Sequence, residues 1–352
     1  GVTLSLGEDA MLETAFPPDT WCKGGCTSVL TFDNCHGCTL TGGGVLNGRG
    51  IQDRWYELFD EGKIDDRPLY LVVTDCSDFV ISGSLTILDS PAFNVLLDGV
   101  AGAEISGLNI TSTWYEKDGE RREPHNTDGI DPTGGSHDIH IHDVYISNGD
   151  DSIAVKPSDP GKPCTRNILV ENAVFKKGHG ASIGSVGSGC VENVVFRNIK
   201  LESTANGARV KTYSSNDGDG HVRNITWTDV EMHEVDNCIV VTDAYKKIDG
   251  AKHHVKVSDL HFENVKGDGC GGDTPVSFVC TSSEPCTGIE LRDVTMSTDS
   301  RIEMSRSSSS SSSSIHNAEP RYYHHHDASM QCENAFGTAS GQIEPESCLR
   351  SN

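Results

Sequence analysis

Positive charge is scarce in this chain of 352 residues. It has 28 Lys and Arg residues against 52 Asp and Glu residues, which gives a formal net charge of −24. A negative excess of this size repels phosphate backbones and anionic lipid surfaces. We therefore expect neither nucleic acid nor membrane among the partners, and an anionic polymer would need a cleft in which cations gather.

Long apolar runs are also lacking. No run approaches the roughly 20 residues that a membrane-spanning helix needs, and no signal peptide is visible. The chain begins with Gly1 instead of Met, so we expect that a leader has already been removed. Aromatic residues make up only 6% and hydrophobic residues 35%. The apolar residues nevertheless form short β-branched runs, so we expect a folded core.

Helical periodicity is the third absence, and it argues against a βαβ fold. Instead, two strand-like runs separated by a polar pair recur along the chain. The pair often contains Asn or Asp, which tolerate the left-handed backbone region, so it predicts a bend. The repeated units are residues 139–141 with 144–146, 168–170 with 173–175, 194–196 with 199–201, 225–227 with 230–232, 255–257 with 260–262, and 289–291 with 294–296.

A period of roughly 20 to 30 residues is typical of a solenoid. A β-sandwich also uses short strands, but it would not repeat one motif at this period. We therefore predict an all-β fold, a single-stranded right-handed parallel β-helix of about ten coils. We expect one catalytic domain over residues 1–352: a cap with cysteine-rich loops at 1–70, regular coils at 69–300, and a C-terminal segment at 301–352 that contains a serine run at 307–314 and three histidines at 324–326.

The 13 cysteines are too many for an ordinary cytosolic protein without a metal. Cys35 and Cys38 form a CxxC motif close to Cys22 and Cys26, so a zinc site is one interpretation. Disulfides in a secreted protein are the better one, and the odd count leaves at least one thiol without a partner in the chain. We expect Cys332 and Cys348 to close a C-terminal loop, and the sequons at Asn109 and Asn224 fit a secreted glycoprotein.

Four polar motifs interrupt the strand pattern at that period. They are Asn-Thr-Asp-Gly at 126–129, Gly-Asp-Asp at 149–151, Gly-His-Gly at 178–180 and Arg-Val-Lys at 209–211. Each motif alone is more often a turn or a solvated strand face than a site. If every coil contributes one strand to a shared face, however, three carboxylates, an imidazole and two cations converge on one groove.

Glycoside hydrolysis needs one protonated and one ionised carboxyl group. Asp150 and Asp151 are adjacent and point to one side only if the chain bends there. With Asp128 beside them, the carboxylates cannot all ionise freely, so one pKa should be raised. Arg209 and Lys211 alternate to one face of a strand, where they could hold a sugar carboxylate.

The order and spacing of these motifs resemble the polygalacturonases of glycoside hydrolase family 28, over residues 69–296 and more weakly over 39–50. The resemblance implies inverting hydrolysis of α-1,4 bonds between galacturonate residues in pectin, without a metal or another cofactor. It makes Asp150 the general acid, assisted by His179, while Asp128 and Asp151 activate water. The residues that it assigns to substrate binding are Asn126, Arg209, Lys211 and Tyr245.

The chain also departs from the family pattern. Many members carry Cys directly after the Asp pair, bridged to a Cys shortly before Gly-His-Gly, whereas this chain has Ser152 and Phe175. We expect a bridge between Cys164 and Cys190 to substitute. The charged segment 114–124 is long and could shape one end of the groove. Internal or chain-end attack therefore stays open, as does a decorated substrate such as xylogalacturonan.

Two other functions remain as alternatives. A pectate lyase also uses a parallel β-helix, but it would need Ca²⁺ and an arginine base. A non-catalytic glycan-binding β-helix would have no reason to keep three aspartates, His179, Arg209 and Lys211 in register. We expect a secreted, extracellular monomer that acts on pectin or polygalacturonate.

Overall fold

The computed structural model describes residues 1–14, 18–22, 25–298 and 328–351, and almost all of its regular structure is strand. Sheet A has 16 strands and sheet B has 10. The strands of sheet A are β1 (Thr3–Leu6), β2 (Met11–Glu13), β4 (Thr39–Gly42), β5 (Val45–Asn47), β7 (Ser77–Gly83), β8 (Thr86–Leu88), β10 (Ala101–Ser106), β11 (Asn109–Thr111), β15 (His137–His142), β16 (Tyr145–Asn148), β18 (Thr165–Lys177), β20 (Gly189–Glu202), β22 (Gly220–His233), β24 (Val255–Asp268), β26 (Cys286–Met296) and β28 (Ala335–Glu344).

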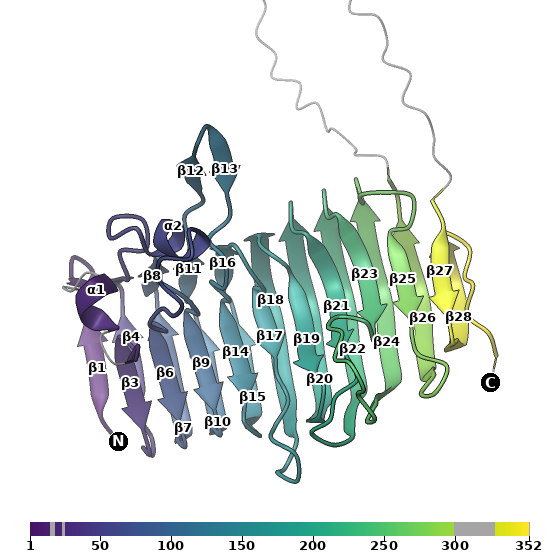
Figure 1. Ribbon diagram of the computed structural model, residues 1–352, viewed down its shortest axis with the longest axis horizontal. Helices are drawn as coiled ribbons and strands as arrows, with labels where there is room; N and C mark the ends of the chain where they lie inside the picture. The colour runs from purple at the N-terminus through teal and green to yellow at the C-terminus, as the bar shows by residue number, and fades with distance from the viewer. Residues whose placement is uncertain (15–17, 23–24, 299–327, 352) are drawn as a thin grey trace, which may run out of the picture.

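Sheet B receives one strand from each turn of the chain, and Figure 1 shows the turns stacked along one axis. Its strands are β3 (Leu30–Asp33), β6 (Leu71–Thr74), β9 (Val95–Asp98), β14 (Ile130–Thr133), β17 (Ile153–Val155), β19 (Ala181–Val186), β21 (Asn206–Thr212), β23 (Asn237–Thr242), β25 (Val276–Val279) and β27 (Met330–Glu333). The chain is a right-handed parallel β-helix, which confirms the predicted fold class. The number of complete coils stays a prediction.

The bends inside sheet A lie where the sequence predicts them. Asn167 and Asn193 adopt the left-handed region with φ of 56° and 55°, and Asn224 does so in the next coil with φ of 56°. Their side-chain amides form a ladder: Asn224 Nδ2 donates to Asn193 Oδ1 over 2.8 Å, and Asn193 Nδ2 donates to Asn167 Oδ1 over 3.1 Å. The polar side chain at each bend thus forms a hydrogen bond with the neighbouring coil.

The interior of the coils is a column of apolar side chains held in register by the parallel pairing. Phe196 pairs with Trp227 and Trp227 with Phe262 along sheet A. The ring centroids of Phe196 and Trp227 are 5.5 Å apart, and those of Trp227 and Phe262 are 5.0 Å apart, with nearly parallel planes. Burying each large side chain contributes about 1.5–3 kcal/mol, so the low aromatic content is concentrated where it stabilises most.

Two elements project from the stack near the coils of β11 and β16. One is the antiparallel hairpin of β12 (Tyr115–Lys117) and β13 (Glu120–Arg122), and the other is the short helix α2 (Trp55–Asp60), which lies beside it in Figure 1. The Tyr115 hydroxyl donates a hydrogen bond to Asp60 and so ties the hairpin to the helix. The hairpin lies within the segment 114–124 that the sequence singles out; whether it shapes one end of a substrate groove stays a prediction.

The first 70 residues already take part in both sheets, apart from the short helix α1 (Pro18–Trp21) and α2. Leu30 pairs with Leu71 in sheet B, and Leu40 pairs with Ile81 in sheet A. The division of the chain into cap, coils and C-terminal segment stays a prediction. The serine run at 307–314 and the histidines at 324–326 lie outside the described residues. No helix among the described residues is long and apolar enough to cross a membrane.

Ten of the 13 cysteines form five disulfides: Cys22–Cys26, Cys164–Cys190, Cys238–Cys270, Cys280–Cys286 and Cys332–Cys348. The expected C-terminal closure and the expected bridge of Cys164 to Cys190 are both confirmed. The zinc interpretation that combines all four N-terminal cysteines is wrong, because two of them are joined to each other and are not thiolates. The three free thiols are Cys35, Cys38 and Cys76.

Candidate active site

Three of the four polar motifs lie where the chain passes from sheet A into sheet B, and the fourth, Arg209 to Lys211, lies within β21 of sheet B. Asp128 lies two residues before the start of β14. Asp150 and Asp151 lie in the bend between β16 and β17, and His179 lies in the turn between β18 and β19. Because β14, β17 and β19 are neighbours in sheet B, residues 22 to 51 positions apart in sequence become neighbours in space. The bend also turns both members of the Asp pair to one side, as the sequence requires for a site.

Glycine is needed on both sides of His179, because the backbone passes close to other coils. A Cβ on Gly178 would lie 2.3 Å from Asn148 Oδ1, and one on Gly180 would lie 2.0 Å from the carbonyl oxygen of Asn206. Both glycines also have positive φ, 57° and 77°. The two glycines therefore admit the backbone and side chains of neighbouring coils and fix where the imidazole points.

Asp151 is buried at the centre of the cationic part of the site. Its Oδ1 accepts hydrogen bonds from Arg209 Nη2 at 2.5 Å and from Ser182 Oγ at 2.8 Å. Its Oδ2 accepts from Lys211 Nζ at 2.5 Å. Ser182 and Arg209 are register partners in β19 and β21, so the ladder itself delivers both donors to one oxygen. Hydrogen bonds from two cationic side chains therefore fix the position of this carboxyl group.

Asp150 forms a different pair, with the imidazole of the next coil. His179 Nδ1 lies 3.0 Å from Asp150 Oδ1, and the backbone N–H of Asn126 donates to Asp150 Oδ2 over 3.2 Å. Burial alone would raise the pKa of Asp150, but the hydrogen bond and the charge of His179 outweigh it and hold that pKa below its usual value. At rest, the proton of this pair therefore sits on the imidazole.

The second nitrogen of His179 also faces a carboxylate. Glu123 Oε2 lies 3.7 Å from His179 Nε2, and Glu123 Oε1 lies 3.2 Å from His125 Nε2. His125 Nδ1 lies 2.9 Å from Asp60 Oδ1 in α2. Burial would lower the pKa of His179, but Asp150 and Glu123 together raise it to about 10. A chain of alternating acids and imidazoles thus links α2 and the end of the hairpin to Asp150.

Asp128 has a third environment. It is buried, and its Oδ2 lies 3.1 Å from Lys156 Nζ, which is also 3.3 Å from Asp131 Oδ2. Burial and the charge of Asp131 raise the pKa of Asp128 well above its usual value, against the opposing charge of Lys156. The sequence argument that crowding should raise one pKa is thus met at Asp128, and not at Asp150, the residue to which the resemblance gives the role of acid.

The predicted substrate-binding residues all lie around these carboxylates. The ring of Tyr245, which follows β23 and is 44% exposed, lies 5.1 Å from Lys211 Nζ. The Asn126 side chain accepts a hydrogen bond from the buried guanidinium of Arg67, with its Oδ1 2.9 Å from Arg67 Nη2. Arg209 and Lys211 already hold Asp151, so any contact with a substrate uses the donors that remain. Their binding role stays a prediction.

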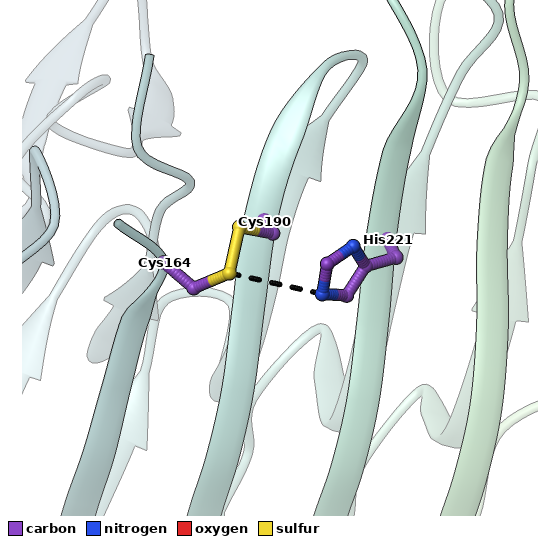
Figure 2. Close-up of side chains that lie close together, drawn as sticks. All are labelled: Cys164, Cys190 and His221. Atoms are coloured by element: carbon purple, nitrogen blue, oxygen red, sulfur yellow. Dashed lines mark hydrogen bonds between the residues drawn. A yellow bond between two sulfur atoms is a disulfide. The ribbon is translucent and has the colours of Figure 1, made fainter. Parts of the chain in front are cut away.

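Within the described part of the chain, two groups of side chains bring enough ligand atoms together for a metal ion. Asp150, Asp151 and His179 offer atoms within 4.8 Å of one another, and these groups also make the protein contacts described above. Figure 2 shows the other group: the disulfide of Cys164 with Cys190 and the ring of His221, whose Nε2 lies 3.7 Å from Cys164 Sγ. Disulfide sulfurs are poor metal ligands, since the thiolate is the form that binds metals.

Sequence reasoning missed four residues that touch this site: Glu123, Asp131, Lys156 and Ser182. Each stands outside the four motifs, and none belongs to a repeated pattern. Asp131 lies three positions after Asp128, and Lys156 ends the apolar run of β17, where a lone cation is unexpected. Those two signals were available, but only the pairing of the coils shows that they meet.

The profile of "Glycosyl hydrolases family 28" matches residues 12–319 of the chain. A probable polygalacturonase of Arabidopsis thaliana is 34% identical over 288 residues, 79% of this chain, and the chain spans only 58% of that relative. A polygalacturonase of Prunus persica is 26% identical over 95% of this chain and 76% of its own length. The solved polygalacturonase from Erwinia carotovora ssp. carotovora superposes with a TM-score of 0.73 at 26% identity, covering 85% of this chain and 81% of that one. The chain belongs to family 28 of the glycosyl hydrolases.

Proposed function

We propose that the protein is a polygalacturonase, which hydrolyses α-1,4 bonds between galacturonate residues of pectin by an inverting general acid/base mechanism. The observation that carries the proposal is the meeting of Asp128, Asp150 and Asp151 with His179, Arg209 and Lys211 at one edge of stacked coils. The three carboxyl groups stand in three different electrostatic environments, as acid and base catalysis at one pH requires.

The acid in this proposal is the pair of Asp150 and His179. The two groups share one proton across a 3.0 Å contact. When the proton lies on Asp150, it can pass to the glycosidic oxygen as the bond from that oxygen to the anomeric carbon breaks. His179 then acts through Asp150: it holds the proton at rest and transfers it to the Asp150 carboxylate, which passes it to the leaving oxygen and becomes a carboxylate again.

The base in this proposal is a carboxylate on the opposite side of the bond. A water molecule attacks the anomeric carbon and gives its proton to Asp128 or Asp151. Asp151 has cationic donors on both oxygens, which hold it in place and suit it to orienting the water. The raised pKa of Asp128 makes it the stronger base once it has ionised.

The proposed substrate is anionic because of the local charge balance. Arg209 and Lys211 together outweigh Asp151 by one positive charge, in a chain whose net charge is strongly negative. Such a spot attracts a sugar carboxylate, and the half-exposed ring of Tyr245 beside Lys211 offers a flat surface for the sugar. Asn126 lies next to Asp150 and would contact the sugar there.

The test is the product formed from polygalacturonic acid in the presence of a calcium chelator. We expect new reducing ends without the absorbance of a conjugated unsaturated uronate, which a lyase would give. Proton NMR of the first product should show the inverted anomer. This measurement matters because oxygens of Asp150 and Asp151 lie within 4.8 Å, nearer than the carboxyl separation of about 6.5–9.5 Å usual for inverting enzymes. Binding without any new ends would indicate a non-catalytic glycan-binding protein.

The setting of this activity is part of the proposal. The five disulfides favour an oxidising, extracellular compartment, where pectin of the cell wall would be the substrate. We expect a secreted monomeric glycoprotein with one catalytic domain. Mass analysis of the purified protein before and after glycosidase treatment, combined with light scattering, checks both the glycan and the monomer.

A further inference from the structure

Beneath Asp128 lies a buried charge cluster that no catalytic role has absorbed. Asp131 follows Asp128 by three residues, at the start of β14, and its side chain has no exposed surface. Lys156 reaches both carboxyl groups from the next coil, at 3.1 Å and 3.3 Å. The backbone N–H of Lys156 donates to the carbonyl oxygen of Pro132 over 2.8 Å, which holds this lysine against β14.

Stability is a poor explanation for the cluster. It has one ammonium for two carboxyl groups, and three of their four oxygens have no hydrogen-bond partner within the described residues: Asp128 Oδ1 and both oxygens of Asp131. Buried charges that are not fully hydrogen-bonded are costly, and well-packed apolar side chains in their place are often neutral or stabilising. The cluster is therefore expected to lower the free energy of unfolding relative to apolar packing, and it includes Asp128, a carboxyl group of the proposed active site.

We propose that Asp131 and Lys156 are positioning residues of the catalytic site, and that they determine together when Asp128 is a carboxylate. The inference rests on the proposed hydrolase function, in which Asp128 takes a proton from water. Asp131 competes with Asp128 for the single ammonium of Lys156, so the two carboxyl groups share one proton. Asp128 becomes a base only when that proton has left.

The charges around Asp128 support this sharing. Asp131 acts on it from β14, the strand that follows Asp128, Lys156 from the following coil, and Asp150 and Asp151 from the bend before β17. Burial and the charge of Asp131 raise the pKa of Asp128, while Lys156 lowers it. Burial likewise raises the pKa of Asp131 to about 6, against the opposing charge of Lys156.

The experiment is the pH dependence of kcat/KM on polygalacturonic acid, measured from reducing ends. Removing the negative neighbour in Asp131→Asn should lower the pKa of Asp128 and move the acid limb to lower pH. Removing the cation in Lys156→Met should raise that pKa and move the acid limb to higher pH. Each shift should be about one to three pH units, the size expected when a charge beside a carboxyl group is removed. Lys156→Arg keeps the charge and should leave the limb near its original position.

Matched controls separate this effect from a general loss of charge. Asp143→Asn removes an exposed carboxylate from a sheet A bend, and Lys176→Met removes a surface ammonium that pairs with Glu202; neither should move the limb. Folded Asp131 and Lys156 variants with an unmoved acid limb, or with shifts in the same direction, would overturn the inference. An inactive wild-type protein would overturn the proposed function instead.

A second measurement uses the wild-type protein and avoids any variant that does not fold. With ¹³C-labelled aspartate, the carboxyl resonance of Asp128 is identified by its loss in Asp128→Asn or, failing that, by its coupling to assigned backbone atoms. We expect it to titrate above the ordinary aspartate value and together with the resonance of Asp131. A midpoint at or below that value would overturn the inference by itself.

Discussion

The bends of sheet A and the turns that lead into sheet B use two related residue types, Asn and Asp, for opposite purposes. In the ladder, Asn167, Asn193 and Asn224 are neutral, half-exposed or exposed, and bonded to their own kind in the next coil. In the turn between β16 and β17, Asp150 and Asp151 carry acidic side chains that are largely buried and hydrogen-bonded to basic side chains. A polar residue that repeats at the same bend in successive coils therefore identifies a structural role. Polar residues that do not repeat, and that are buried with partners of opposite charge, identify the candidate active site.

The largest expected effect tests the acid. Asp150→Asn should lower kcat by about 10²–10⁴-fold, because an amide cannot give an acidic proton to the leaving oxygen. The matched control is Asp138→Asn, the same change in the ladder, where Asp138 has φ of 58° and accepts a hydrogen bond from Asn167. That variant should keep the wild-type kcat. Reducing-end assays at saturating polygalacturonate measure both, and near-normal turnover by Asp150→Asn would remove this residue from the mechanism.

The second effect concerns the cations. Lys211→Met leaves Asp151 buried with one cation fewer, and breaking a buried ion pair costs about 3–5 kcal/mol. We expect a lower midpoint of thermal unfolding and a higher KM for polygalacturonate. The loss of kcat/KM should be smaller on methyl-esterified pectin than on polygalacturonate. Lys176→Met breaks an exposed pair with Glu202 and should change stability by less than about 1 kcal/mol. Equal losses on both substrates would argue against recognition of the sugar carboxylate.

The sequence predicts the bends of sheet A and the meeting of the four motifs because both follow from the period of the coil. The hydrogen bonds between the asparagines of neighbouring coils are seen only in the structure. The residue type of Asn193 and Asn224 indicates a bend at each position. Asp128, Asp150 and His179 are predicted to meet once each coil is assumed to contribute one strand to a shared sheet. The contacts of Glu123, Asp131 and Lys156 are not predictable in this way. These contacts depend on how deeply each side chain is buried and on which residues the neighbouring coil places beside it. The local sequence shows neither of these.

The same gap explains where the pKa prediction fell short. Crowding of carboxylates predicts that one pKa is raised, but it does not say which. The structure raises that of Asp128, which has a buried acid beside it, and lowers that of Asp150, which has an imidazolium beside it. Both neighbours, Asp131 and His179, come from the details of the packing.

A third, smaller effect sharpens the comparison on the chemical side. Glu123 helps to raise the pKa of His179, so Glu123→Gln should lower it. The proton of the Asp150–His179 pair would then be lost at lower pH, and the alkaline limb of kcat/KM should move down by about one pH unit. Glu171→Gln, which changes a carboxylate that pairs with His140 and Arg197 in sheet A, is the control. An alkaline limb that stays in place would show that Glu123 only supports the hairpin.

The smallest effect is expected in the ladder itself. Asn193→Ala removes the side-chain hydrogen bonds to Asn167 and Asn224. It also places a residue that has a Cβ but no polar side chain at φ of 55°. Asn193→Gly loses the same bonds but tolerates the left-handed backbone. Both should keep kcat unchanged, and Ala should lower the unfolding midpoint more than Gly, by an amount equivalent to about 1 kcal/mol. If the two variants unfold at the same temperature, asparagine stabilises the bend through its side-chain hydrogen bonds and not through its tolerance of the left-handed backbone. The exposed ladder would then resemble the active site in depending on specific side-chain contacts between coils.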